Sequence, residues 1–352
     1  MKKNKNKFNI AFIGGGMMAQ VAHIPFYLKN KNCEISYICE SRPSIITHLS
    51  KTIPQAKIIN EYHQIFEDSK IDAVIISIPR AATSYITSEV LKNKLHVLAE
   101  KPMAYTLNQA KKLSKLAIDN NLIYSIGYMK RYDIGIKYAK FLLEKFKMNK
   151  VYGNLLSARF YNHSKSYIFS PPNHQRPSES RQIRFKEWTT CPSWIPKQYI
   201  NSYDWFMNSC SHDINLLSYF FDSETFDIKY CIYTNENSLS ALLIANNVNI
   251  ILDFASSSSG EWTEGIDFVF ENCKLEIMIP SPMDINHASN IILSEKNKPK
   301  KKLFIKNPVW SFEEQAHAFI KCLEYKDTPA TSGNDAYNDL KIVQNIWRKL
   351  IE

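Results

Sequence analysis

A charged pair and a proline interrupt an apolar run in the segment LHVLAEKPMAY, residues 95–105, as Glu100, Lys101 and Pro102. If the apolar run is a strand of a parallel sheet, its carboxyl end faces the crevice in which such sheets bind ligands. An ammonium group at that place can donate a hydrogen bond to a substrate hydroxyl and stabilise the negative charge that develops on its oxygen. Lys101 is therefore a candidate catalytic residue, although a solvated lysine at a strand end has the same pattern.

A glycine-rich turn lies near the start of the chain. The apolar run at 8–13 leads directly into GGGMMA, residues 14–19, which contains three of the nine glycines. A backbone without Cβ atoms can approach a pyrophosphate closely, and the following helix N-terminus offers free N–H groups and a positive dipole end. The pattern predicts a dinucleotide site whose phosphate contacts are Gly14, Gly16, Met17 and Met18.

An acidic residue, Glu40, directly follows the second apolar run at 33–39. A carboxylate at that strand end can accept hydrogen bonds from both ribose hydroxyls of adenosine, and it would repel a 2′-phosphate. Arg42, together with Ser41, could instead hold such a phosphate. The sequence therefore favours NAD, with NADP not excluded. The remaining predicted cofactor contacts are Ser77, Pro79 and Glu100, with Lys101 beside them.

Alternating apolar runs and amphipathic segments of helical length fill the first 148 residues. The runs at 8–13, 33–39, 56–60, 72–78, 95–99 and 122–127 predict a doubly wound parallel sheet, a Rossmann domain of the α/β class. Later runs, beginning with 151–162 and continuing between 227 and 306, predict a mostly antiparallel sheet in an α+β domain. We expect domains at 1–148 and 149–310, with C-terminal helices at 311–352 that pack back on the body.

The order of these motifs resembles that of the Gfo/Idh/MocA family of oxidoreductases. The resemblance comprises the glycine turn, the E-K-P after the fifth run, GYMKRYD at 127–133 after the sixth, and the closing segment 311–350. It implies a Rossmann domain followed by a domain with a large open sheet that often forms the oligomer interface, here of a homodimer or homotetramer. It also implies a nicotinamide beside Lys101 and a helix-borne histidine, and a substrate that is a sugar, sugar phosphate, nucleotide sugar or cyclitol.

The segment 203–221 is predicted to be one helix, and it corresponds to the family's D-x-x-x-H-x-x-D motif. Here the motif contains Asn208, His212 and Asn215, so both acids are replaced by amides. Residues with this spacing share a helix face. The resemblance implies that His212 relays a proton, and we expect Asn208 and Asn215 to hydrogen-bond substrate. Because an amide does not stabilise an imidazolium as a carboxylate does, His212 is expected to be less basic than in relatives unless another acid approaches it.

Three further residues are candidates for substrate binding. Tyr128 and Lys130 follow the sixth apolar run, where loop residues can approach a ligand. Arg181 lies in the irregular segment 163–199, which is rich in proline, serine and arginine. Arginines there could bind a phosphate or diphosphate, and they could equally line a subunit contact.

Composition excludes several functional classes. The formal net charge of +10 comes from ten lysines in residues 1–7 and 296–306, without which acidic and basic residues are equal at 34 each. Such lysine tails do not predict nucleic-acid binding. No apolar stretch is long enough for a membrane span. Seven scattered cysteines without a C-x-x-C pair predict reduced thiols in the cytoplasm and no metal site.

The sequence thus predicts an NAD(P)-dependent oxidoreductase that transfers hydride between nicotinamide and a secondary hydroxyl or ketone of a sugar-type substrate. Two alternatives remain open. The first is a dinucleotide-binding regulator without turnover, which the two amides at 208 and 215 favour. The second is a lyase or glycosidase that retains NAD for transient oxidation.

Overall fold

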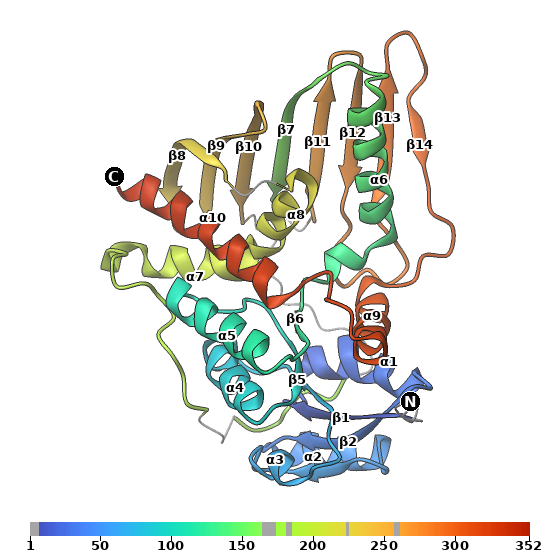
Figure 1. Cartoon of the computed structure of the whole chain (residues 1–352), viewed down its shortest axis with the longest axis vertical. Helices are drawn as coiled ribbons and strands as arrows, with labels where there is room; N and C mark the ends of the chain where they lie inside the picture. The colour runs from blue at the N-terminus through green and yellow to red at the C-terminus, as the bar shows by residue number, and fades with distance from the viewer. Residues whose placement is uncertain (1–6, 164–173, 181–184, 223–224, 257–260) are drawn as a thin grey trace. The chain divides into compact units, whose positions relative to one another are not determined.

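The computed structural model describes residues 7–163, 174–180, 185–222, 225–256 and 261–352 (Figure 1). The chain divides into two compact units. The first comprises Met1–Tyr128, Ser170–Thr190 and Phe312–Tyr337, and the second Met129–Phe169, Cys191–Ser311 and Asn338–Glu352. The first unit thus includes two segments that lie beyond residue 148 in the sequence.

The first unit contains a six-stranded sheet in the order β3-β2-β1-β4-β5-β6, with every pair parallel. Its strands are β1 (Phe8–Ile13), β2 (Cys33–Cys39), β3 (Lys57–Ile59), β4 (Ala73–Ile76), β5 (His96–Ala99) and β6 (Tyr124–Ile126). The central strand β4 is buried along its whole length, as expected for a strand with helices on both faces. The predicted doubly wound α/β fold is confirmed, and each strand lies within a predicted run.

Helices connect these parallel strands. They are α1 (Ile24–Lys29), α2 (Pro43–Thr52), α3 (Gln64–Glu67), α4 (Arg80–Lys92) and α5 (Leu107–Asp119), and α9 (Ser311–Tyr325) falls almost wholly in the same unit. The start of α5 is fixed by a capping box, in which Thr106 accepts from the backbone of Gln109 and the Gln109 side chain accepts in return. The crossovers carry the chain back so that every strand ends at the same edge of the sheet.

The second unit contains an eight-stranded sheet in the order β14-β13-β12-β11-β7-β10-β9-β8. Only the β7–β10 pair is parallel among these strands, and the other pairs are antiparallel. The strands are β7 (Leu155–Asn162), β8 (Asp227–Asn235), β9 (Ser238–Ala245), β10 (Val248–Ala255), β11 (Glu264–Phe270), β12 (Cys273–Met278), β13 (Asn290–Glu295) and β14 (Lys301–Leu303). The predicted α+β region with a mostly antiparallel sheet is confirmed.

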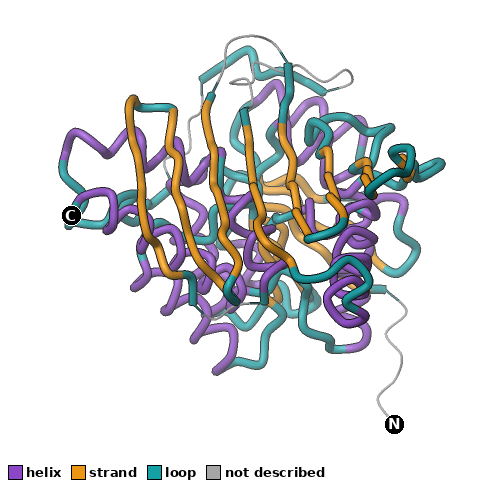
Figure 2. Tube along the Cα trace, turned by 90° about the horizontal axis from the view of Figure 1, so that it is seen from above, coloured by secondary structure: helices purple, strands orange, loops and turns teal. Residues whose placement is uncertain are grey.

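One face of this sheet is buried and the other is open. Helix α6 (Ile134–Asn149) contacts β13, and α8 (Ser211–Phe221) contacts β7. On β10, Ile250 and Leu252 point to the buried face, whereas Asn249 and Ile251 are exposed. Figure 2 shows the strands of this sheet with no described helix drawn over the face turned toward the viewer. The open face therefore presents both polar and apolar side chains.

The prediction of one helix over 203–221 was wrong. Helix α7 (Ile200–Ser209) ends one residue before Cys210, and α8 begins at Ser211. The backbone oxygen of Cys210 accepts from the N–H groups of both Asp213 and Ile214 at 3.1 Å, which starts a new helical turn. Asn, Ser and Cys at 208–211 are weak helix formers because their side chains compete for backbone hydrogen bonds.

The last helix, α10 (Gly333–Ile351), begins in the first unit and continues into the second. Among the helices that the structure describes, none is both long and apolar enough to span a membrane.

Candidate functional site

The glycine turn after β1 requires glycine at its first position. Gly14 has a φ of +101°, and a Cβ there would lie well under 3.0 Å from the backbone oxygen of Ser77, which follows β4. Helical structure begins at Met17 and includes Met18, both half-buried. The first N–H groups of a helix have no acceptor within the helix, so they are available to an anion. The turn thus has the construction of a phosphate cradle.

The helix after this turn contains a π-helical turn over Ala19–His23. Proline at 25 has no N–H to donate to the carbonyl four residues earlier, which disrupts the regular ladder at this point. His23, buried within it, places its Nε2 2.7 Å from Oε1 of Glu100. No role for His23 was predicted from the sequence. Its position two residues before Pro25 was the feature that could have drawn attention to it.

Six of the predicted cofactor residues meet at the carboxyl edge of the parallel sheet. They line one small cavity of about 40 Å³, together with Cys39, Ser41, Ile78 and Phe185. The six are Gly14, Gly16, Glu40, Arg42, Ser77 and Pro79. They come from the ends of β1, β2 and β4, which are far apart in sequence and neighbours in the sheet. The cavity is far smaller than a nucleoside, so side chains at its mouth must move for a dinucleotide to enter.

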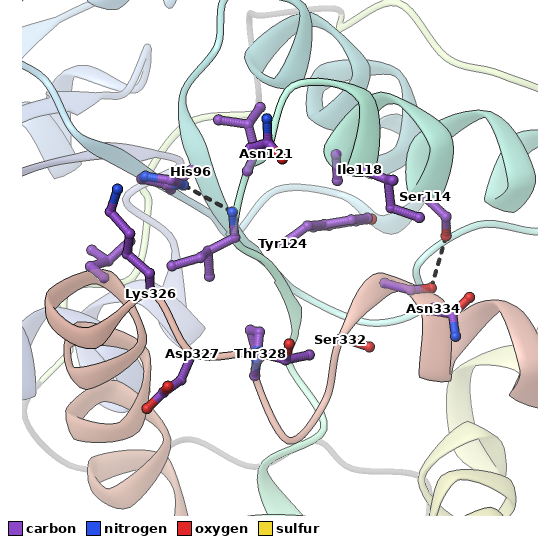
Figure 3. Close-up of a pocket in the computed structure, with 16 residues that line it drawn as sticks. His96, Ser114, Ile118, Asn121, Tyr124, Lys326, Asp327, Thr328, Ser332 and Asn334 are labelled. Atoms are coloured by element: carbon purple, nitrogen blue, oxygen red, sulfur yellow. Dashed lines mark hydrogen bonds between the residues drawn. The ribbon is translucent and has the colours of Figure 1, made fainter.

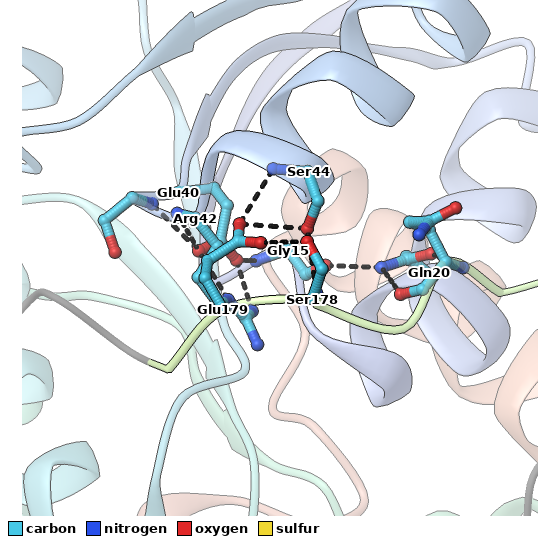
Figure 4. Close-up of polar contacts among 9 residues, drawn as sticks. Gly15, Gln20, Glu40, Arg42, Ser44, Ser178 and Glu179 are labelled. Atoms are coloured by element: carbon cyan, nitrogen blue, oxygen red, sulfur yellow. Dashed lines mark hydrogen bonds and ion pairs between the residues drawn. The ribbon is translucent and has the colours of Figure 1, made fainter.

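Glu40 is saturated with hydrogen bonds. Its Oε1 accepts from the backbone N–H of Ser41 and of Arg42 and from Arg42 Nε, while its Oε2 accepts from Gly15 N–H and Arg42 Nη2 (Figure 4). Burial raises the pKa of Glu40, but the hydrogen bonds and charge of Arg42 outweigh it and keep the pKa below its usual value. Glu40 is therefore an anion whose charge is neutralised by Arg42.

The E-K-P segment follows β5 at the same edge of the same sheet. Glu100 holds His23 through Oε1, and its Oε2 accepts from the backbone N–H of Lys101 at 3.3 Å. Lys101 is half-buried, and the peptide bond between it and Pro102 is cis. Glu100 thus connects the strand that bears Lys101 to the helix that follows the glycine turn.

In the second unit, the three residues that were predicted to share one helix face lie on two helices, Asn208 on α7 and the other two on α8. Asn208 is exposed on α7, whereas His212 lies in the first turn of α8 and is half-buried. Asn215 is buried, with 1% of its surface exposed, and its amide is committed to other side chains. It accepts from Arg131 Nε at 2.9 Å and donates to Asp339 at 2.7 Å. These bonds favour a structural role for Asn215, and its predicted contact with substrate stays a prediction.

A buried ionic cluster surrounds Lys130. Its ammonium forms an ion pair with Glu264 and lies 5.8 Å from the centre of the Trp262 ring. The carboxyl groups of Glu264 and Asp213 interact, and Asp213 accepts from Asn162 at 3.0 Å. Burial, followed by the nearby Asp213, raises the pKa of Glu264 to about 8, against the opposing charge of Lys130. Lys130 is therefore bound to Glu264 and its charge also acts on Asp213, and this too favours a structural role.

The other predicted substrate contacts have different outcomes. Tyr128 is buried at the end of the first unit's main segment. Arg181 lies outside the described residues. Among the residues that are described, no group of three or more His, Cys, Asp or Glu side chains is arranged to hold a metal ion.

A larger cavity, of about 680 Å³, lies elsewhere in the first unit (Figure 3). Its lining includes His96 at the start of β5, Tyr124 at the start of β6, Lys326 just after α9 and Asn334 in the first turn of α10. It is therefore at the amino ends of the strands, opposite the edge at which such sheets bind ligands. It contains none of the predicted site residues, and we place the candidate site at the glycine turn despite its smaller volume.

Fold and site together define a two-domain protein with a dinucleotide crevice and a lysine at its edge. Residues 8–128 match the family described as "Oxidoreductase family, NAD-binding Rossmann fold" (GFO_IDH_MocA). This match agrees with the resemblance that the motifs predicted, over about the first third of the chain.

Individual relatives are similar to part of the chain. An uncharacterized oxidoreductase of Schizosaccharomyces pombe is 30% identical over 40% of this chain and 39% of its own length. The scyllo-inositol 2-dehydrogenase (NADP⁺) of Bacillus subtilis is 24% identical over 38% of this chain and 36% of its own. The matched region thus spans about two fifths of the length of these relatives.

The fold is shared over nearly the whole chain. A 3-ketoreductase from Actinomadura kijaniata, solved with NADP and TDP-benzene, superimposes with a TM-score of 0.76 over 98% of each chain at 14% identity. At this identity the comparison establishes the fold, and the two-unit architecture of the present chain is that of this reductase.

Proposed function

We propose that the protein is an NAD(P)-dependent oxidoreductase that acts on a secondary hydroxyl, or the matching ketone, of a sugar, sugar derivative or cyclitol. One observation carries the proposal. The six predicted cofactor residues converge at the carboxyl edge of the parallel sheet, and Lys101 follows β5 at that same edge. The glycine cradle fits a pyrophosphate because a side chain at Gly14 would collide with the end of β4.

A bound nicotinamide would supply the hydride acceptor or donor. Lys101 would donate a hydrogen bond to the reacting oxygen of the substrate and stabilise its alkoxide-like charge. His212 would exchange the proton of the same hydroxyl. Asn208, which is exposed on α7, would hydrogen-bond a neighbouring hydroxyl, whereas Asn215 and Lys130 would support the site through their buried partners.

The substrate class is supported by the relatives, which include an enzyme named for scyllo-inositol and a 3-ketoreductase solved with a TDP derivative. The cysteines support a reducing compartment, because all seven are free thiols and none forms a disulfide. We therefore place the activity in the cytoplasm.

The test is turnover of nicotinamide, followed at 340 nm, with a panel of cyclitols, sugars and nucleotide sugars. Lys101→Ala should lower kcat by about 10²- to 10⁴-fold while it spares dinucleotide affinity, since it removes only a group that acts on the substrate oxygen. Lys111→Ala, which changes an exposed lysine on α5, is the matched control. Undiminished activity of the Lys101 variant would show that the site is misassigned.

Two outcomes would favour the alternatives. Tight dinucleotide binding without any absorbance change across the panel would indicate a regulator. Purified protein that carries its cofactor and converts substrate without consuming free nicotinamide would indicate transient oxidation followed by elimination or hydrolysis.

We also propose that the open face of the eight-stranded sheet joins copies of this chain in a homodimer or homotetramer. Apolar side chains on that face are exposed on neighbouring strands, with Ile232 at 44%, Leu242 at 38% and Ile251 at 45%. An exposed apolar patch of this kind commonly marks an interface. The double variant Leu242→Lys, Ile251→Lys should dissociate the assembly in light scattering, whereas Met148→Lys on α6 should not. A monomeric wild type would refute the interface.

A further inference from the structure

Residues from the middle of the chain lie along the glycine turn. The backbone N–H of Gln175 donates to Oε1 of Gln20 at 2.8 Å, and Gln20 Nε2 donates to the backbone oxygen of Gly15 at 2.8 Å. Phe185, farther along the same part of the chain, lines the small cavity beside Glu40 and Arg42. Residues 174–180 are thus attached to the dinucleotide crevice by specific bonds.

The same stretch delivers a carboxylate to the start of α2. Oε1 of Glu179 accepts from the backbone N–H of Ser44 at 2.8 Å and from its hydroxyl at 2.9 Å, and Oε2 accepts from Ser178 at 2.6 Å (Figure 4). Ser44 is the second residue of a ten-residue helix, so Glu179 accepts one of the N–H groups that a helix leaves unpaired. These bonds, from Ser178 first and then Ser44, lower the pKa of Glu179 to about 2. The N-terminus of α2 therefore already binds an anionic group, the carboxylate of Glu179.

The carboxylate of Glu179 adjoins the position at which the ribose of the adenosine is expected to bind. In a doubly wound sheet the ribose lies beside the acid at the end of the second strand, here Glu40. Arg42 hydrogen-bonds Glu40, and the charge of Glu179 also acts on it, since both carboxylates raise the pKa of Arg42. The single positive charge of Arg42 thus faces the two negative charges of Glu40 and Glu179. The three side chains together carry a net charge of −1 where a 2′-phosphate would bind.

The hydrogen-bond capacity of the two acids also differs. Glu40 accepts five hydrogen bonds, although a carboxylate offers about four lone-pair sites. Among the described residues, Glu179 accepts three hydrogen bonds from Ser44 and Ser178 and is half-exposed, so it retains capacity for another donor. A ribose 2′-hydroxyl can donate to a carboxylate, whereas a 2′-phosphate at neutral pH offers only acceptors and negative charge.

We propose that Glu179 is a specificity-determining residue that selects NAD over NADP by occupying the anion position at the N-terminus of α2. The inference rests on the proposed function, because it concerns the cofactor of that same site. It also reassigns the discriminating carboxylate, which the sequence analysis located at Glu40.

Titration calorimetry of the purified full chain with NAD⁺ and with NADP⁺ tests the proposal. Wild type should prefer NAD⁺. Glu179→Gln should tighten NADP⁺ binding by about tenfold or more, since it removes a close like-charge contact, and should change NAD⁺ binding by less than about threefold. Ser44→Ala should shift the ratio in the same direction by a smaller factor, because it removes one of the bonds that seat Glu179.

Glu187→Gln is the matched control, since Glu187 is an exposed acid on the same part of the chain and the same charge is removed. It should leave both affinities unchanged, and thermal melting should show that all variants are folded. A wild type that prefers NADP⁺, or an unchanged affinity ratio in Glu179→Gln, would overturn the inference while the oxidoreductase proposal stands. Absence of binding of both dinucleotides to wild type would overturn the proposed function itself.

Discussion

The imidazole of His23 and the carboxylate of Glu100 lie 2.7 Å apart, with His23 buried and Glu100 half-buried. The pair connects the helix after the glycine turn to the segment that bears Lys101. His23 also packs edge-on against Phe312, with ring centres 5.8 Å apart. One hydrogen bond therefore joins these two segments directly.

Loss of this bond should cost stability. His23→Ala removes the hydrogen bond to Oε1 of Glu100 and a buried ring, so we expect the free energy of unfolding in urea to fall by about 2–4 kcal/mol. His48→Ala on α2, where the histidine is only half-buried, should cost much less. Equal losses in the two variants would contradict the role given to the His23–Glu100 pair.

Gly14 and Gly16 should respond differently to substitution by alanine. Gly14→Ala places a Cβ against Ser77 at a positive φ, so we expect destabilisation of about 2 kcal/mol or more. At Gly16 the nearest atom to a Cβ is Arg42 Nη2 at 3.6 Å, an ordinary contact. Gly16→Ala should keep the melting temperature and weaken dinucleotide binding, because the methyl group intrudes on the phosphate path. Unchanged affinity of a folded Gly16 variant would count against the cradle.

The buried cluster at Lys130 predicts a pH dependence of stability. The pKa of Glu264 is raised to about 8 in the folded state, so the folded protein holds a proton that the unfolded chain releases near its ordinary value. The stabilisation that comes from this bound proton is complete below about pH 4.5 and is lost as the pH rises through about 8. The free energy of unfolding falls over this range with a slope of at most about 1.4 kcal/mol per pH unit.

Glu264→Gln should flatten this dependence, which urea unfolding at pH 6 and pH 8.5 would measure. Glu261→Gln, a change of an exposed acid near β11, should retain the wild-type slope. The cluster would have to be reinterpreted if Glu264→Gln and wild type lost stability in parallel.

The two amides of the histidine motif should behave differently when each is changed to aspartate. In the wild type, Nδ2 of Asn215 donates to Asp339 at 2.7 Å. Asn215→Asp removes this donor and places a second carboxylate beside Asp339. We expect a loss of about 1–3 kcal/mol in unfolding free energy, partly offset by Arg131. Asn208→Asp, on the exposed surface of α7, should leave stability unchanged. A stable Asn215→Asp protein with an altered KM would instead support direct substrate contact.

Much of the fold follows from local sequence. Runs such as 8–13 and 72–78 specify buried strands because their apolar residues have no polar face, and their alternation with amphipathic segments leaves the parallel crossover as the available topology. GGGMMA indicated a tight turn after the first strand, and the close approach of Gly14 to Ser77 indeed tolerates no Cβ. The failure at 203–221 came where weak helix formers allowed α7 and α8 to separate at Cys210.

The motifs alone predicted the class of fold, the resemblance to the Gfo/Idh/MocA family and the edge of the sheet at which a ligand crevice is expected. Only the tertiary structure revealed that Lys130 pairs with Glu264 and that Glu179 lies at the start of α2. The physical reason is sequence separation. Glu179 lies 135 residues from Ser44 and Glu264 lies 134 residues from Lys130, and no local pattern encodes which distant charge will be buried against which.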